Sequence, residues 1–419
     1  MKKDWEIKKQ NLEGSTPSTC EAGVSPLQTS SLPQHALKAG WQIKTLQEVC
    51  CMKITDGTHQ TPKYCEENEG GFPFISAKNV TKGVIDWTDI KYIIPELHEE
   101  LYKRIAPKRD DILLAKNGTT GVAALVDVDK VFDIYVTLAV LRPDKNIIFP
   151  RYLLYVVNSQ YCKAQFDSHL KGIGVPNLHL VEIQQVKIPL PPLEEQKRIV
   201  DVLDEKFAQL ETIKANAQSN LQNAKDLFQS QLTKAFSNTT WEKKKISEIS
   251  ENLDSKRIPI TKNVRKAGQY PYYGASGIVD YVEDYIFDGK FLLVSEDGAN
   301  LLARTYPIAF IAEGKFWVNN HAHILSFKDE ITMKFVELYF SNLDISPYVT
   351  GMAQPKFNQA SLNNIEIPLP PLPEQKRIVK ELDTLSEKVR QLQDIYTKQI
   401  SDCDELKQSL LAKAFEGEL

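Results

Sequence analysis

The chain has 419 residues, of which 42% are hydrophobic and 25% charged, with a formal net charge of −4. The length predicts more than one folded domain, and the slight acidic excess argues against a protein held on nucleic acid by bulk positive charge. The six cysteines form no paired Cys-x-x-Cys set, so we expect free thiols. No apolar stretch reaches the roughly 18 residues of a membrane span, and we expect a cytoplasmic protein.

Residues 1–40 are predicted to be an N-terminal extension that is partly disordered. Trp5-Glu6-Ile7-Lys8-Lys9 is similar to the start of a domain, but a long segment rich in Ser, Thr, Pro and Gln follows it. Such a composition buries too little apolar surface to fold.

Residues 41–187 and 237–366 predict two related domains. Trp41-Gln42-Ile43-Lys44 is matched by Trp241-Glu242-Lys243-Lys244, and the segment 73–78 by 271–276. The other matches pair Leu141 with Leu325, Ile147 with Ile331, Leu154 with Leu338, Tyr155 with Tyr339, Asn158 with Asn342, Gly172 with Gly351 and Pro176 with Pro355.

Both of these segments have a mixed composition of strand and helix signals. Short β-branched and aromatic runs, such as 291–294 and 308–311, are separated by Asn-Gly, Asp-Gly and Glu-Gly turns. One amphipathic helix is predicted near 150–165 and another near 332–343. We therefore expect α+β domains, each with a twisted and largely antiparallel sheet.

Residues 188–236 and 367–419 each predict a long helix. The sequence from Ile188 to Val200 returns as Ile367 to Val379, and only Glu194 is replaced, by Pro373. After the proline run, apolar residues recur at spacings of three and four for roughly 40 residues, which predicts a helix of roughly 60 Å. The matched length and phase favour an antiparallel coiled coil and an internal pseudo-two-fold; the alternative is two unrelated helices, each packed on its own domain.

Motifs for catalysis are missing from the sequence. There is no Gly-rich phosphate loop followed by Lys, and no acid-x-Lys follows Pro143-Asp144 to complete a nuclease site. His321 and His323 could form a metal pair, but strand histidines that bond their neighbours are more common. We predict no catalytic residue and no metal ligand in this chain.

The order of two variable segments and two Pro-Leu-Pro-Pro-Leu-x-Glu-Gln-Lys-Arg-Ile-Val helices resembles the specificity (S) subunit of type I restriction-modification systems. The stretches 56–63 and 317–323 also resemble parts of target-recognition domains. The resemblance implies one target-recognition domain per half of a bipartite double-stranded DNA site, with the helices as spacers between the half-sites. It also implies two methyltransferase (M) subunits and restriction/translocase (R) subunits as partners, which would use S-adenosylmethionine and ATP.

Candidate base-contacting residues are polar or aromatic side chains at expected turns, because such groups can hydrogen-bond or stack on base edges. In the first domain they are Thr58, His59, Gln60, Lys63, Lys78, Asn79, Lys116, Asn117 and Thr119. In the second domain they are Tyr272, Tyr273, Ser276, Glu296, Asp297, Asn300, Arg304, Asn319 and Asn320. Partner docking is assigned to the repeated residues Glu195, Gln196, Lys197 and Arg198 and to Glu374, Gln375, Lys376 and Arg377; these residues could instead only cap the helices.

A second class of function is also compatible with the sequence. A coiled-coil scaffold whose globular domains bind other proteins or glycans would suit the nearly neutral charge. Genes for an adenine methyltransferase and a helicase-nuclease beside this one would favour the specificity subunit. An enzyme is the third choice, because no catalytic motif was found.

Overall fold

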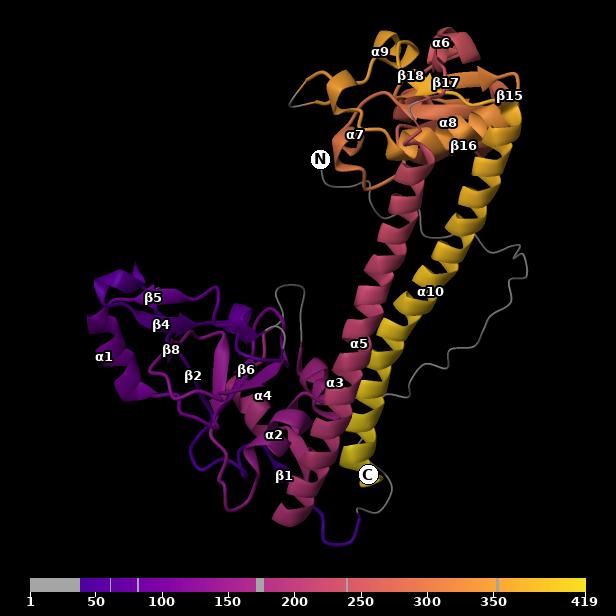
Figure 1. Ribbon diagram of the computed structural model, residues 1–419. Coiled ribbons are helices and arrows are strands. Elements are labelled where there is room, and N and C mark those ends of the chain that lie inside the picture. Colours follow the sequence, from indigo (N-terminus) through magenta and orange to yellow (C-terminus); the bar gives the residue numbers. More distant parts are fainter. Residues whose placement is uncertain (1–37, 61, 81–82, 171–176, 239, 352–353) are drawn as a thin grey trace. The chain divides into compact units, whose positions relative to one another are not determined.

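The computed structural model describes residues 38–60, 62–80, 83–170, 177–238, 240–351 and 354–419 (Figure 1). Almost all of the predicted N-terminal extension, together with Gly172 and Pro176, therefore lies outside the described residues. Contacts divide the chain into two compact units. Unit 1 comprises 1–208 and 406–419, and unit 2 comprises 209–405. Each unit contains one predicted domain and part of both long helices.

Unit 1 holds two four-stranded sheets in place of the single sheet predicted. One has the antiparallel order β2-β9-β6-β7; the other has the order β3-β5-β4-β8, in which β4 and β8 are parallel. Ile75, Leu113, Ile134 and Val140 come from both sheets and share one buried cluster. The strands are β2 Thr55–Asp56, β3 Tyr64–Cys65, β4 Phe72–Ile75, β5 Lys91–Ile93, β6 Ile112–Ala115, β7 Ala123–Leu125, β8 Asp133–Ile134 and β9 Leu138–Leu141.

The helix predicted near 150–165 is two helices, and the prediction of one was wrong. Asn158 ends the first, where its side-chain amide bonds the backbone N–H and C=O of Ala123, both at 2.9 Å. Ser159 then caps the second by accepting the N–H of Cys162. The helices of this unit are α1 Pro95–Arg104, α2 Pro150–Val157, α3 Gln160–His169 and α4 Leu180–Gln185.

Unit 2 is built on a six-stranded sheet with the order β12-β17-β15-β16-β13-β14. All its pairings are antiparallel except β13 with β16, so the largely antiparallel sheet is confirmed here. The helix predicted at 332–343 is α8, which Asp329 caps and which packs on β15, β16 and β17. The elements are β12 Ser250–Asn252, β13 Ala267–Gly274, β14 Gly277–Val282, β15 Phe287–Ser295, β16 Ala309–Val318, β17 Ala322–Phe327, α6 Ile246–Ile249, α7 Asn300–Ala303, α8 Glu330–Asn342 and α9 Gln359–Asn363.

In each unit a separate two-stranded ladder joins the start of the domain to its end. β1 (Gln42–Thr45) pairs with β10 (Lys187–Leu190), and β11 (Lys243–Lys245) pairs with β18 (Glu366–Pro368). Both ladders are antiparallel. The first and last strands of each domain thus lie next to each other, and a long helix follows the last strand.

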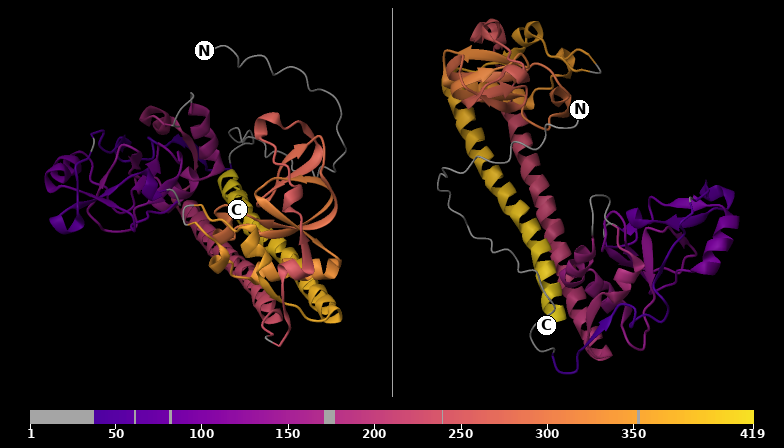
Figure 2. Two further views of the ribbon diagram at one scale, coloured as in Figure 1. Left: turned by 90° about the horizontal axis from the view of Figure 1, so that it is seen from above. Right: turned by 180° about the vertical axis from the view of Figure 1, so that it is seen from behind.

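The two long helices are α5 (Leu193–Ala235, 43 residues) and α10 (Leu372–Glu416, 45 residues). In unit 2 they lie side by side in every view (Figures 1 and 2), with Leu232 and Leu382 in one buried cluster. An ion pair of 2.6 Å joins Lys214 to Asp404 in the same unit. Leu232 lies near the end of α5 and Leu382 near the start of α10, whereas Lys214, in the middle of α5, pairs with Asp404 further along α10, so the helices run antiparallel.

The same pairing is present in unit 1. Lys407 Nζ lies 5.0 Å from the ring centroid of Phe207, and the Arg198 guanidinium donates to the backbone oxygen of Leu419 at 2.6 Å. The predicted antiparallel helix pair is therefore confirmed within each unit. Across the described part of the chain, none of the helices has the length and apolarity needed to cross a membrane.

Candidate nucleic-acid interface

A tight turn follows the central strand β6 of unit 1. Gly118 has φ 75°, a left-handed conformation that favours glycine. Asn117 forms an isolated antiparallel bridge with Asn177, and the N–H of Leu178 donates to the carbonyl of Lys116 at 2.8 Å. The turn is therefore held by the segment that directly precedes α4.

An equivalent turn follows β15 in unit 2. Gly298 has φ 104°, and Asp297 forms an isolated antiparallel bridge with Lys356. The N–H of Phe357 donates to the carbonyl of Glu296 at 2.7 Å. The two units thus hold their turns in the same backbone frame, but the side chains on this frame differ.

Lys116 is one of the residues that differ, and it is buried. Its Nζ lies 2.5 Å from Asp56 Oδ2, and its side chain is 8% exposed. Arg104 and His59 also contact the Asp56 carboxylate, each at 3.3 Å. A buried ammonium with this partner is part of the fold, and the assignment of Lys116 to base contact stays a prediction that its burial does not favour.

Glu296 stands at the corresponding position in unit 2, with the opposite charge. It accepts a hydrogen bond from Arg257 Nη1 at 2.8 Å, and another nitrogen of the same guanidinium lies 3.4 Å from Asp254 Oδ2. His323 completes the group: its Nδ1 is 2.5 Å from Asp254 and its Nε2 is 2.8 Å from the Phe357 carbonyl. Glu296 is therefore held within the fold, and its contact with a base stays a prediction.

Asp56 and Asp254 occupy equivalent positions in the two units. Asp56 directly follows Thr55, which pairs with Val140 of β9. Asp254 directly follows Leu253, whose N–H donates to the carbonyl of Ile324 in β17. Both units therefore bury an Asp beside the turn but neutralise it differently.

Burial by itself would raise the pKa of Asp254. The hydrogen bonds from His323 and from the Ile324 N–H, with the positive charge of Arg257, outweigh burial and lower the pKa below its ordinary value. Ligand atoms of Asp254, Glu296 and His323 lie within 4.8 Å of one another, close enough for a metal ion. The Arg257 guanidinium, however, already bonds both acids, so the group is balanced as an ion-pair network.

His321 and His323 serve different partners. His321 Nδ1 lies 2.8 Å from Asp297 Oδ2 on the turn and is half exposed, whereas His323 is buried against Asp254. The preference for histidines that bond their neighbours over a metal pair is consistent with these contacts.

Four further candidates are buried, and each has a role in the fold. Tyr272 is fully buried, and its hydroxyl bonds the backbone of Ile260. Asn79 bonds the carbonyls of Asp86 and Asp89 through its amide nitrogen. Thr58 and Asn319 hold local turns through the N–H groups of Gln60 and His321. Contact of these side chains with DNA stays a prediction that their burial does not favour.

Two other candidates are tied to neighbouring backbone. Arg304, in a left-handed conformation, donates to the carbonyls of Phe340 and Leu343 at the end of α8. Asn300 bonds both the N–H and the C=O of Tyr306 and closes the loop after α7. Both residues are partly exposed, but their polar groups are used by the fold.

The remaining candidates lie at the surface of the two units. Asn117, Asp297 and Tyr273 are partly exposed. The exposed candidates are His59, Gln60, Lys63, Lys78, Thr119, Ser276 and Asn320. These side chains are able to meet a ligand without disturbing the core.

The docking candidates at the starts of the long helices are of two kinds, buried glutamines and charged residues at the surface. Gln196 is fully buried; its side-chain oxygen accepts the N–H of Phe149 at 2.8 Å, and its amide nitrogen donates to the carbonyls of Ile147 and Pro191. Gln375 is 4% exposed, and its amide nitrogen donates to the carbonyl of Pro370 at 2.7 Å. Both glutamines therefore fix the helix starts, and the assignment of their side chains to partner contact stays a prediction that their burial does not favour.

The charged neighbours of these glutamines are at the surface. Lys197 and Arg198 pair with Glu194 and Glu195, and the hydrogen bonds from Arg198 lower the pKa of Glu195 to about 2. In the second copy, Arg377 pairs with Glu374 and Glu381, and Lys376 is exposed. Both copies thus present exposed charge at the first turns of the helix.

Some residues of the interface were not among the predicted ones. Asn177 and Lys356 hold the turns, and Arg257 balances both Asp254 and Glu296. The matched Gly and Pro residues before the helices indicated that these segments are related. No local signal in the sequence indicated that these segments contact the turns, because the bridges join residues that are far apart in the chain.

Two domains of one fold, each with a polar turn and exposed hydrogen-bonding side chains, define a class of two-domain recognition proteins joined by paired helices. The sequence matches the type I restriction modification DNA specificity domain over residues 38–222 and again over 238–398. The chain belongs to this family of type I restriction-modification specificity subunits.

Relatives include a putative MjaX specificity subunit of Methanocaldococcus jannaschii, 25% identical over 90% of this chain and 93% of that protein. The EcoKI specificity subunit of Escherichia coli K12 is 25% identical over 91% and 90%. A putative specificity subunit of Haemophilus influenzae is 39% identical, but over only 37% of this chain and 40% of its own length.

Two solved structures have the same fold. One comes from work on complex assembly and conformational transition of the type I restriction-modification system; it has a TM-score of 0.72, 19% identity and coverage of 92% of this chain and 100% of its own. The HsdS subunit from Thermoanaerobacter tengcongensis has a TM-score of 0.58, 20% identity and coverage of 92% and 99%. The predicted family and fold class are thereby confirmed.

Proposed function

We propose that this specificity subunit recognises a bipartite double-stranded DNA site, with one half-site for each recognition domain. The observation that carries the proposal is the shared turn frame described above. Asn117–Asn177 and Asp297–Lys356 form the same bridge, but the side chains around the two bridges differ. One backbone frame with two sets of side chains suits two half-sites of different sequence.

We further propose that the chain carries out no chemistry itself. Methyltransferase subunits would bring S-adenosylmethionine, and restriction/translocase subunits would use ATP. Two methyltransferases would dock, because the exposed charges Lys197 and Arg198 recur as Lys376 and Arg377. In unit 2 the paired helices also expose apolar side chains, which offer contact area to a partner: Ile213, Leu227, Leu392 and Ile395.

The proposal is tested by exchanging one domain. Residues 243–368, which begin and end on the β11-β18 ladder, are replaced by the equivalent segment of a relative. The methylated adenines are then mapped in cells that carry the methyltransferase. We expect one half of the methylated sequence to change and the other to stay, because each turn frame is complete within one domain.

Two results would contradict the proposal. If both halves change, the domains are not independent readers. If deletion of the gene leaves the methylation pattern unaltered, the chain does not direct methylation, and the scaffold function is the better explanation.

A further inference from the structure

The outer edge of strand β10 in unit 1 is closed by a helix of the same unit. The N–H and C=O of Lys187 point away from β1. Backbone groups alternate in direction along an antiparallel strand, and the preceding residue, Val186, already accepts a hydrogen bond from Leu46 on the β1 side. Gln165 of α3 bonds both groups: its amide nitrogen donates to the Lys187 carbonyl and its oxygen accepts the Lys187 N–H, each at 2.9 Å.

The equivalent strand β18 in unit 2 has an open edge. Glu366 is the counterpart of Lys187. The residue before it, Ile365, accepts a hydrogen bond from the N–H of Ile246, just as Val186 accepts one from Leu46 in unit 1. Its carbonyl has one long contact, 3.4 Å from the Tyr339 hydroxyl. Among the described residues no acceptor meets the Glu366 N–H. Between α8 and α9, the described residues contain only a short 3-10 turn (Ser346–Tyr348) and no counterpart of α3.

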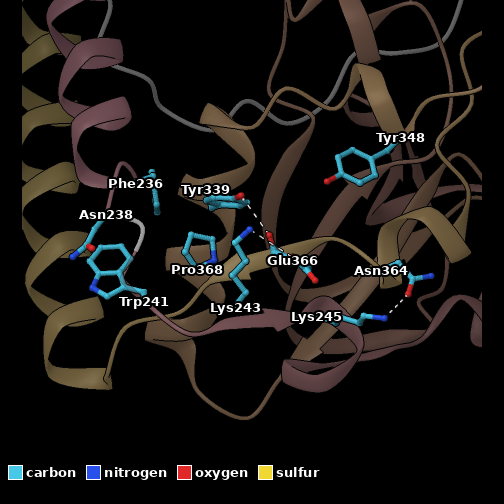
Figure 3. A pocket seen from close by; sticks show the side chains of 10 residues that line it. All are labelled: Phe236, Asn238, Trp241, Lys243, Lys245, Tyr339, Tyr348, Asn364, Glu366 and Pro368. Carbon is cyan, nitrogen blue, oxygen red and sulfur yellow. Dashed lines mark hydrogen bonds and ion pairs between the residues drawn. The ribbon is translucent and has the colours of Figure 1, made fainter.

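A cavity of about 640 Å³ lies at this open edge (Figure 3). Aromatic side chains form part of its wall, and Lys243 and Lys245 extend into it from the same face of β11. Lys243 lies 3.7 Å from Glu366, and Lys245 donates to Asn364 at 3.1 Å. The aromatic residues are Phe236, Trp241, Tyr339 and Tyr348.

We propose that this cavity receives a helix of the methyltransferase partner, which takes the place that α3 takes in unit 1. Unit 1 shows what fits such an edge: a helix that presents one amide side chain to both backbone groups of the outward-facing residue. The partner helix would present Gln or Asn to Glu366 and an acidic side chain to Lys245, because the ammonium of Lys245 donates to the neutral amide of Asn364, whereas Lys243 is paired with Glu366. The proposal rests on the proposed function for the identity of the partner.

Hydrogen–deuterium exchange of the full chain, with and without the methyltransferase subunit, tests the inference. We expect amide exchange at Glu366 to slow on assembly, because its N–H gains an acceptor. Exchange at Lys187 should stay unchanged, since Gln165 already bonds it. Gln165→Ala in the free chain should speed exchange at Lys187, which calibrates the measurement.

Charge reversal provides a second readout. Lys245→Glu should weaken binding of one methyltransferase about tenfold, as expected for an interfacial charge placed against its complement. Lys244→Glu is the matched control: it makes the same change on the same strand, but Lys244 points to the opposite face and pairs with Glu242. We expect the control to bind as the unchanged chain does.

The outcomes separate this inference from the proposed function. Assembly that leaves Glu366 exchange unchanged, or an equal loss of affinity in both lysine variants, overturns the cavity as a docking site and leaves DNA specificity intact. A chain that binds no methyltransferase overturns both.

Discussion

Asp56 and Lys116 illustrate how single residues decide between fold and recognition. The Lys116 ammonium neutralises a carboxylate that is 3% exposed, at 2.5 Å. We expect Lys116→Met to lower the free energy of unfolding by about 3 kcal/mol, because it leaves a buried charge with weaker partners. Urea unfolding of the variant measures the change.

The double variant Asp56→Asn with Lys116→Met is the control for this prediction. It removes both charges, so it should recover part of the lost stability. A single variant that unfolds within about 0.5 kcal/mol of the original chain would show that the pair is not structural.

Exposed side chains near the turns should behave in the opposite way. Asn320→Ala and Gln60→Ala remove hydrogen-bonding groups from exposed residues in different domains. We expect each to relax one base position in one half-site by about 1–3 kcal/mol of discrimination, with unfolding unchanged within about 0.5 kcal/mol. Methylation of a library of variant sites measures the discrimination, and an unaltered preference in both variants would remove these residues from the interface.

Sequence could not separate these two groups of residues. Lys116 and Lys78 are both polar residues at predicted turns, but one is buried and the other exposed. The partner of Lys116 is Asp56, which is 60 residues away, and a contact over this sequence separation cannot be predicted from local patterns. Gly118 and Gly298, by contrast, identified their turns correctly, because a left-handed conformation is a local requirement.

At the scale of the element, the starts of α5 and α10 combine a buried amide with exposed charge. We expect Lys197→Glu with Arg198→Glu to remove one of two bound methyltransferases, because it reverses two exposed positive charges and leaves Gln196 in place. Analytical ultracentrifugation reports the mass of the complex.

The second copy supplies the comparison. Lys376→Glu with Arg377→Glu should remove one methyltransferase as well, and all four changes together should remove both. A complex of full mass from the fourfold variant would show that these charges serve only the helix start.

The helices themselves were predicted well because their signals are local. The proline run forbids helix before Leu193, and the three-four spacing continues without Gly or Pro. The break between α2 and α3 was missed, because Asn158 ends α2 through a tertiary hydrogen bond to Ala123. A residue 35 positions away gives no periodic signal.

At the scale of the whole molecule, the paired helices are proposed to set the separation of the half-sites. Inserting four residues after Ala217 and four after Tyr396 lengthens both helices by about 6 Å at about 1.5 Å per residue. That length corresponds to about two base pairs at about 3.4 Å each. We expect the same half-sites with a longer spacer, as seen by methylome sequencing.

The two insertions must be made together. Either one alone shifts the register of α5 against α10 and should break contacts such as Lys214 with Asp404. An active double-insertion protein with an unchanged spacer would contradict the proposal that the helices measure distance.

The buried charges beside the two turns also restrict how hybrid specificities can arise. Asp56 is balanced by Lys116, whereas Asp254 and Glu296 share Arg257. A crossover between an acid and its balancing residue would join incompatible halves and bury two carboxylates together without their cation. Recombination between related genes should therefore succeed when it falls at the paired strands β1 and β10 or β11 and β18, and new specificities should be inherited as intact blocks.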